Sequence, residues 1–188
     1  KIGIKEKIII VGHGAQQVQD TLGDKFKYVE QKEQLGTGHA VMAAQNSIPK
    51  GVDDILLLSG DTPLLTPDTL TLLIEEHKKT GASATVLTAF VSDPAGYGRI
   101  IRDSEHVKKI IEDKDASFEQ KKIKEINTGT YCFKAEKLFK VLGKIQPANA
   151  QGEYYLTDVL ELLNMDGETV NAVMTEDAEE IMGINNRV

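Results

Sequence analysis

The fold is decided by the stretch Ile55-Leu56-Leu57-Leu58-Ser59-Gly60-Asp61-Thr62-Pro63-Leu64-Leu65. Four consecutive aliphatic residues followed by a glycine, a carboxylate and a proline predict a strand that is buried on both faces and ends in a tight turn. In open α/β sheets, ligands bind at that edge. Asp61 is therefore either a ligand-binding acid or a residue that caps the turn or the helix near Pro67, and this stretch alone leaves both interpretations open.

Composition narrows the class of protein. The chain has 188 residues, 40% of them hydrophobic, which suits one α/β domain with a substantial core. Its formal charge is −7 and its basic residues are scattered, so we expect no nucleic-acid partner. No apolar run approaches the roughly 18 residues of a membrane span, and no signal peptide is visible. We expect a cytoplasmic protein without a membrane partner.

The single cysteine, Cys132, lies in the strand-like run 129–133. One cysteine excludes an intrachain disulfide and favours a reducing compartment. A thiol in a strand is more often core packing than a nucleophile. We therefore expect Cys132 in the core.

The first half of the chain alternates between strand and helix patterns. Strands are predicted at 8–11, 26–30, 55–58 and 83–91, with helices after the first three, and this order predicts a mainly parallel sheet with helices on its faces. In the second half, the turn cluster 93–98 introduces a β-hairpin over 99–112. The remaining elements predicted are a strand at 125–133, helices at 135–142 and 155–163, a strand at 170–174, and a short acidic helix after it.

Two glycines flank a threonine in Gly36-Thr37-Gly38, directly before a helix-forming run. Glycines let the backbone approach a ligand closely, Thr37 can cap the helix, and free N–H groups in the first turn suit a phosphate or a base carbonyl. The alternative is an ordinary loop with a helix cap.

Six motifs in this order resemble one family closely. They are Glu33-Gln34-Leu35-Gly36-Thr37-Gly38-His39-Ala40, Gly60-Asp61-Thr62-Pro63-Leu64, the run 93–100, Glu125-Ile126-Asn127-Thr128-Gly129, the run 149–158 and Asn185-Asn186-Arg187. The chain resembles the uridyltransferase (pyrophosphorylase) domain of bacterial bifunctional N-acetylglucosamine-1-phosphate uridyltransferase/glucosamine-1-phosphate acetyltransferases. The resemblance implies a three-layer, mainly parallel Rossmann-like nucleotidyltransferase sheet with helices on both faces and a small β-hairpin excursion.

The resemblance also implies a reaction. In this family the phosphate oxygen of N-acetylglucosamine 1-phosphate attacks the α-phosphorus of UTP, giving UDP-N-acetylglucosamine and pyrophosphate for cell-wall precursor synthesis. Such chemistry needs in-line positioning and neutralised phosphate charge, usually through Mg²⁺. The parent proteins also carry an acetyltransferase and form homotrimers through a β-helix domain.

The family's functional residues carry over onto matching positions. Asp61 and Asn185 match its Mg²⁺ ligands, which are also the expected catalytic residues. Gln31, Gly36 and Thr37 match residues beside the uracil, and Ser59 and Gly60 match contacts to the nucleoside. The amino-sugar positions are matched by Gly98, Glu112, Asn127 and Thr128. Without the resemblance, Glu112 reads as a solvated strand end and Asn127 as a turn-former.

The chain departs from the family at both ends. The family opens with a glycine-rich loop and a lysine that wrap the triphosphate, and nothing in residues 1–188 corresponds to them or to the β-helix domain. We therefore expect residues 1–188 to be a partial uridyltransferase domain that is weakly active in isolation. The alternatives are a related nucleotidyltransferase of different base or sugar specificity, and a non-catalytic fragment that binds nucleotide sugars.

Overall fold

The computed structural model describes residues 2–183. The strands are β1 (Ile8–Val11), β2 (Lys27–Glu30), β3 (Asp54–Leu57), β4 (Ala84–Phe90), β5 (Arg99–Asp103), β6 (His106–Ile111), β7 (Glu125–Lys134) and β8 (Val170–Met174). The α-helices are α1 (Ala15–Leu22), α2 (Thr37–Ala44), α3 (Pro67–Thr80), α4 (Ala135–Leu142) and α5 (Asp158–Met165), and 3₁₀ turns cover Gln45–Ser47 and Gln120–Lys122. Every strand that the sequence predicts is present.

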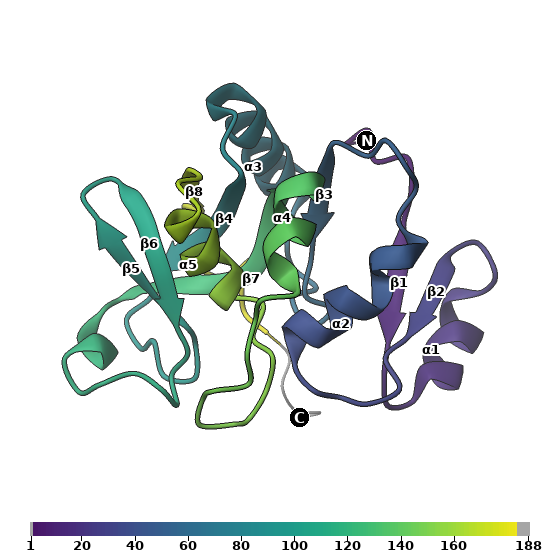
Figure 1. The fold of residues 1–188 in the computed structure, drawn as a ribbon, viewed down its shortest axis with the longest axis horizontal. Coiled ribbons are helices and arrows are strands. Elements are labelled where there is room, and N and C mark those ends of the chain that lie inside the picture. Colours follow the sequence, from purple (N-terminus) through teal and green to yellow (C-terminus); the bar gives the residue numbers. More distant parts are fainter. Residues whose placement is uncertain (1, 184–188) are drawn as a thin grey trace.

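Two sheets make up the strand framework (Figure 1). The main sheet has six strands in the order β6-β5-β7-β4-β8, and β3 also pairs with β7. The pair β1 and β2 forms a separate parallel sheet. In Figure 1 the β5–β6 hairpin and the β1–β2 pair stand at opposite sides of the molecule.

Strand direction differs from the mainly parallel sheet that the alternation predicts. β7 pairs antiparallel with β3, β4 and β5, whereas β4 and β8 are parallel. The strands β3, β4 and β8 therefore run the same way, as expected, but β7 lies between β3 and β4 and reverses both contacts. The expectation failed because the position of β7 depends on contacts with residues far away in the sequence.

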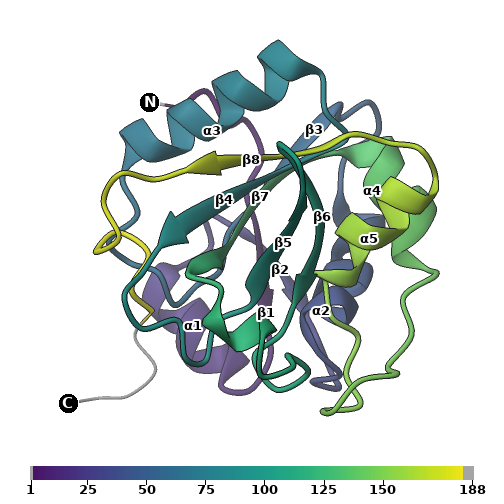
Figure 2. The same cartoon turned by 90° about the vertical axis from the view of Figure 1, so that its left-hand side faces the viewer.

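Helices cover both faces of the sheet, which confirms the α/β class. One core packs α4 and α5 against residues of β4 and β7, including Val86 and Phe133. The second core packs Leu73 of α3 against Leu87 and Cys132. Figure 2 shows α3 along one side of the sheet and α4 and α5 along the other. Because neighbouring residues of β4 point to opposite faces, one strand supplies both cores.

Cys132 belongs to the core, as predicted. Its side chain is 2% exposed, and burial raises the pKa of its thiol to about 12. Within residues 2–183, no helix combines the length and the apolar character needed to cross a membrane.

The acidic helix predicted after β8 is not formed. Residues 178–181 form a turn instead. The Asp177 carboxylate accepts a hydrogen bond from the Glu179 N–H at 2.8 Å, and the Thr175 hydroxyl accepts one from the Asp177 N–H at 3.2 Å. Such bonds from side chains to the backbone compete with helix formation.

Candidate functional site

The centre of the candidate site is a fork along β7. Residues 131–134 of β7 pair with β3, whereas Ile126 pairs with Arg99 of β5. The Ser59 hydroxyl, just after β3, donates a hydrogen bond to the Gly129 carbonyl at 3.2 Å, and the Asn127 N–H donates to the Gly98 carbonyl at 2.9 Å. The fork thus brings together three segments that the sequence singles out, from residues 59–61, 98 and 127–129.

Gly129 is required at this fork for two reasons. Its φ of 75° favours glycine, and a Cβ there would overlap the Ser59 hydroxyl. The conformation of Gly129 and the position of Ser59 are therefore coupled. Asn127 supports the same irregular part of β7, because its Oδ1 accepts a hydrogen bond from the Gly129 N–H at 3.1 Å. The Nδ2 of the same amide lies beside the Tyr131 hydroxyl, so at most one of its two N–H groups is open to a ligand.

Glu112 joins this group from the end of β6. A Cβ placed on Gly98 would lie 3.3 Å from Glu112 Oε2 and 3.5 Å from the Asn127 Cβ. Three of the four predicted amino-sugar residues are therefore neighbours, although they come from three different segments. Burial raises the pKa of the Glu112 carboxyl above its usual value, and a hydrogen bond from Thr157 opposes that rise.

Thr128, also predicted to contact the sugar, is turned toward the core. Its side chain is 6% exposed, and its hydroxyl donates to the Leu87 carbonyl at 2.8 Å and accepts from the Thr130 N–H at 3.3 Å. That hydroxyl is therefore engaged inside the protein and is not turned toward the other predicted sugar residues.

The predicted base-side residues surround a cavity of about 240 Å³. Its lining includes Gln31, Gly36, Thr37 and Glu153. The Gln31 Nε2 lies 3.0 Å from the Gly36 carbonyl and 3.0 Å from His39 Nδ1. With the amide nitrogen held inside the protein, the Gln31 Oε1 is the atom left to a ligand.

The two glycines of this turn serve a contact within the protein. A Cβ on Gly36 would stand 2.7 Å from the Tyr154 carbonyl oxygen, and one on Gly38 would stand 2.9 Å from the same atom. The Gly38 N–H donates to that oxygen at 2.7 Å. The segment around Tyr154, and not a ligand, therefore makes the close approach to the backbone of Gly36 and Gly38.

The helix cap predicted for Thr37 is also wrong. Helix α2 begins at Thr37 itself with Gly36 at its N-cap, and no side chain caps it. The Thr37 hydroxyl instead accepts a hydrogen bond from the Leu156 N–H at 3.0 Å. Residues 154–156 thus occupy the Thr37 hydroxyl and the Gly38 N–H, two groups that a local helix cap would use.

Asp61 lies in the exposed turn after β3. A Cβ on Gly183 would stand 3.4 Å from Asp61 Oδ2, so the chain returns beside this carboxylate at its last described residue. Among the described residues, no three His, Cys, Asp or Glu side chains cluster as metal ligands. A single carboxylate nevertheless suits Mg²⁺, which keeps several waters and takes one or two protein oxygens alongside substrate phosphates. Asn185, the other predicted ligand, lies outside the described residues.

An ion pair between a buried arginine and a partly exposed aspartate lies beside Gly98, and no motif in the sequence predicts it. The Arg99 side chain is 2% exposed, donates to the Asp113 carboxylate at 2.8 Å and also bonds the Tyr97 carbonyl. It therefore ties the residue after Gly98 to the residue after Glu112. The predicted hairpin over 99–112 could have indicated this pair, because Arg99 lies opposite Ile111 in the two strands. That inference requires the register of the hairpin, which the sequence does not specify.

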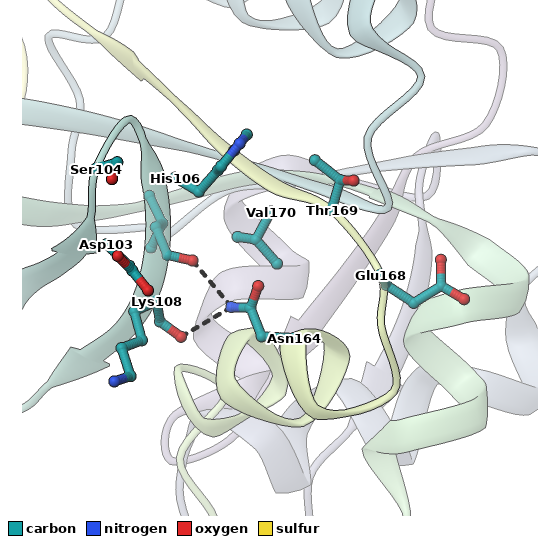
Figure 3. A pocket seen from close by; sticks show the side chains of 9 residues that line it. Asp103, Ser104, His106, Lys108, Asn164, Glu168, Thr169 and Val170 are labelled. Carbon is teal, nitrogen blue, oxygen red and sulfur yellow. Dashed lines mark hydrogen bonds between the residues drawn. The ribbon is translucent and has the colours of Figure 1, made fainter.

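A larger cavity of about 510 Å³ lies at the tip of the β5–β6 hairpin. None of the predicted site residues lines it. Figure 3 shows Asn164 donating to two backbone carbonyls of β6, those of Val107 and Lys108. Glu168, also in the lining, is bonded to Ser83 and Lys137. Two of its polar side chains are thus engaged within the protein, and the cavity lies between α5 and the hairpin.

Comparison with known proteins places the chain in a family. The family model for nucleotidyl transferases matches residues 1–179. The chain belongs to the nucleotidyl transferase family. The bifunctional protein GlmU of Heliobacterium modesticaldum is 54% identical over 187 residues, covering 99% of this chain and 41% of that protein. GlmU of Bacillus cereus (strain G9842) is 48% identical over 189 residues, with 100% and 41% covered. The resemblance seen in the sequence is confirmed, and the chain spans less than half the length of these relatives.

Solved structures support the fold. A UDP-glucose pyrophosphorylase complexed with UDP-glucose superimposes with a TM-score of 0.71 at 18% identity, over 92% of this chain and 74% of that one. The apo form of a UDP-glucose pyrophosphorylase gives a TM-score of 0.70 over the same shares. At this identity the likeness concerns the fold alone.

Proposed function

We propose that the chain is a partial uridyltransferase domain that forms UDP-N-acetylglucosamine and pyrophosphate from UTP and N-acetylglucosamine 1-phosphate. The observation that carries the proposal is the β7 fork, where hydrogen bonds join Ser59 to Gly129 and Gly98 to Asn127. The identity to the two GlmU proteins supports it as well.

In this proposal, the residues of the fork bind and orient the two substrates. The Gln31 side chain and the turn around Gly36 take the uracil, and Asn127 Nδ2 donates to the acetamido carbonyl. Glu112 accepts a hydrogen bond from a sugar hydroxyl, because its free oxygen faces Gly98. Holding both substrates in line converts a bimolecular step into an effectively unimolecular one.

Asp61 is the proposed carboxylate for Mg²⁺, with Asn185 as the second protein ligand. When bound, the ion would offset the charge of the phosphates and withdraw electrons from the phosphorus under attack. The sugar-phosphate oxygen forms the new bond to the α-phosphorus, and the bond to the departing pyrophosphate breaks. Asp61 suits this role because it is exposed at the end of a strand whose turn also carries Ser59.

The test is product formation by the polypeptide as its gene encodes it. UTP, CTP, GTP and dTTP are each supplied with N-acetylglucosamine 1-phosphate or glucose 1-phosphate in the presence of Mg²⁺. We expect UTP with the N-acetyl sugar to give at least roughly tenfold higher kcat/KM than any other pair, because unpaired polar groups penalise the wrong substrate. Preference for another pair would overturn the assignment.

A matched pair of variants sharpens this test. Asn127→Ala removes the proposed acetamido donor, and we expect it to narrow the preference for the N-acetyl sugar. Asn171→Ala on β8 is the control, since β8 pairs with β4 on the side away from β7. Binding of UDP-N-acetylglucosamine without any product would instead indicate a non-catalytic nucleotide-sugar module.

A further inference from the structure

The two oxygens of the Glu112 carboxylate have different surroundings. Oε1 accepts a hydrogen bond from the Thr157 hydroxyl at 2.9 Å. Oε2 points toward Gly98, where an added Cβ would lie 3.3 Å away. One oxygen is therefore held by the protein, while the other faces the candidate sugar residues.

Thr157 is the only side chain among residues 2–183 that hydrogen-bonds the Glu112 carboxylate. The nearby acids have partners of their own, since Asp113 pairs with Arg99 and Asp115 accepts from the Ala150 N–H. The titratable groups that interact electrostatically with Glu112 are Asp113, Asp115, Tyr131, Tyr155 and Asp158. None of them is cationic, so a neutral hydroxyl alone orients this carboxylate.

Thr157 itself is firmly placed. Its side chain is 3% exposed, directly before α5. The preceding residue, Leu156, donates its N–H to the Thr37 hydroxyl at 3.0 Å. Leu156 thus bonds Thr37 on the predicted base side, and Thr157 bonds Glu112 on the predicted sugar side.

Helix α5 is fastened along β6 at two further points. Lys109 bonds Glu161 at 3.0 Å. Asn164 Nδ2 donates to the carbonyls of Val107 at 2.9 Å and Lys108 at 2.8 Å (Figure 3). The helix and the strand are therefore held together from the hairpin tip to Glu112, which keeps Thr157 within reach of the carboxylate.

We propose that Thr157 is a positioning residue that fixes Glu112 with one oxygen free to accept a hydroxyl of the acceptor sugar phosphate. The inference rests on the proposed function, because it takes Glu112 as a sugar contact. It predicts that substrate affinity depends on a side chain that need not touch the substrate.

The test is Thr157→Val, which keeps the shape of the side chain and removes the donor. We expect the KM for N-acetylglucosamine 1-phosphate to rise roughly tenfold to a hundredfold, as for loss of a hydrogen bond to a charged group. The KM for UTP should change by less than about twofold. A rise in the KM values of both substrates would instead indicate general damage to the fold. Thr157→Ser keeps the hydroxyl and should restore the sugar KM.

A second readout needs no substrate. The hydrogen bond from Thr157 lowers the pKa of Glu112, so its loss should raise that pKa further, as followed by ¹³C NMR of the glutamate carboxyls. The acidic limb of kcat/KM for the sugar phosphate should move to higher pH in parallel. If the valine variant does not fold, Thr157→Ala is read in the same way.

Two further variants separate the possible outcomes. Thr130→Val is the matched control, because Thr130 is fully buried and its hydroxyl has no partner among the described residues. If Glu112→Gln raises the sugar KM while Thr157→Val behaves like Thr130→Val, the positioning role is overturned and the proposed function stands. If Glu112→Gln leaves that KM unchanged, the sugar assignment and the positioning role both fail.

Discussion

The Ser59 hydroxyl and the Gly129 carbonyl are joined by a 3.2 Å hydrogen bond that extends the contact between β3 and β7 up to the fork where β5 takes over. This contact relates the turn that carries Asp61 to the part of β7 that carries Asn127. The two bonded residues are separated by seventy residues of sequence, and the bond fixes the spacing of these two segments.

Gly129→Ala should therefore damage both stability and the site. Alanine at a φ of 75° is strained, and its Cβ would displace Ser59, so we expect a loss of about 2–3 kcal/mol in the free energy of unfolding. Gly51→Ala is the control, because Gly51 has a φ of 79° but no atom within 4 Å of an added Cβ. Chemical denaturation measures both, and equal losses would show that contact with Ser59 adds nothing.

Glu180 should stabilise the start of α3. Its carboxylate accepts hydrogen bonds from the Thr66 hydroxyl at 3.1 Å and the Thr69 hydroxyl at 2.5 Å. Glu180→Ala should lower the free energy of unfolding by about 1–3 kcal/mol, because it removes a charged acceptor at a helix N-terminus. The exposed Glu179 next to it is the control, and Glu179→Ala should stay within about 0.5 kcal/mol of the parent. Equal free energies of unfolding for Glu180→Ala and Glu179→Ala would contradict this role of Glu180.

Asp158 should make stability depend on pH. Burial, together with the charges of Glu161 and Glu112, raises its pKa to about 6. The folded state then holds a proton that the unfolded state releases near pH 4, so this group's contribution to stability falls as the pH rises from about 4 to 6. Asp158→Asn should stabilise the protein by about 1 kcal/mol at pH 7 and by nothing below pH 4. A gain that persists at acid pH would contradict the titration as its cause.

Thr130→Val should be neutral or stabilising. The Thr130 hydroxyl is buried without a partner among the described residues, so removing it ends an uncompensated desolvation cost. We expect a gain of up to about 1 kcal/mol in thermal or chemical denaturation. A comparable loss of stability would contradict this expectation, because it would mean that the Thr130 hydroxyl makes a stabilising hydrogen bond.

The sequence predicts which segments form strands and helices better than it predicts which strands pair with each other. The aliphatic run before Ser59 and the alternation up to Val91 identify strands and helices, because hydrophobic periodicity is a local property. The insertion of β7 between β3 and β4 depends on pairings more than forty residues apart, such as Phe133 with Ala84, and no local pattern specifies them.

The same limit applies to the candidate site. Gly36 and Gly38 are recognisable as positions of close approach, but their partner, the Tyr154 backbone, is over a hundred residues away. Thr157 could not be distinguished from an ordinary threonine before a helix, because its value lies in the reach to Glu112. Motifs thus identify the candidate site residues, whereas the residues that support them emerge from tertiary contacts.

We propose that the turn after β3 supplies the metal-binding carboxylate of a UTP-dependent transfer reaction. The most direct measurement is the rate of UDP-N-acetylglucosamine formation against Mg²⁺ concentration, in the polypeptide as its gene encodes it and in its Asp61→Asn variant. We predict a loss of roughly 10²–10³ in rate or more, with unchanged thermal stability, because Asp61 is exposed and acts on the phosphates. An Asp61→Asn variant with the parent's rate and Mg²⁺ dependence would contradict the claim.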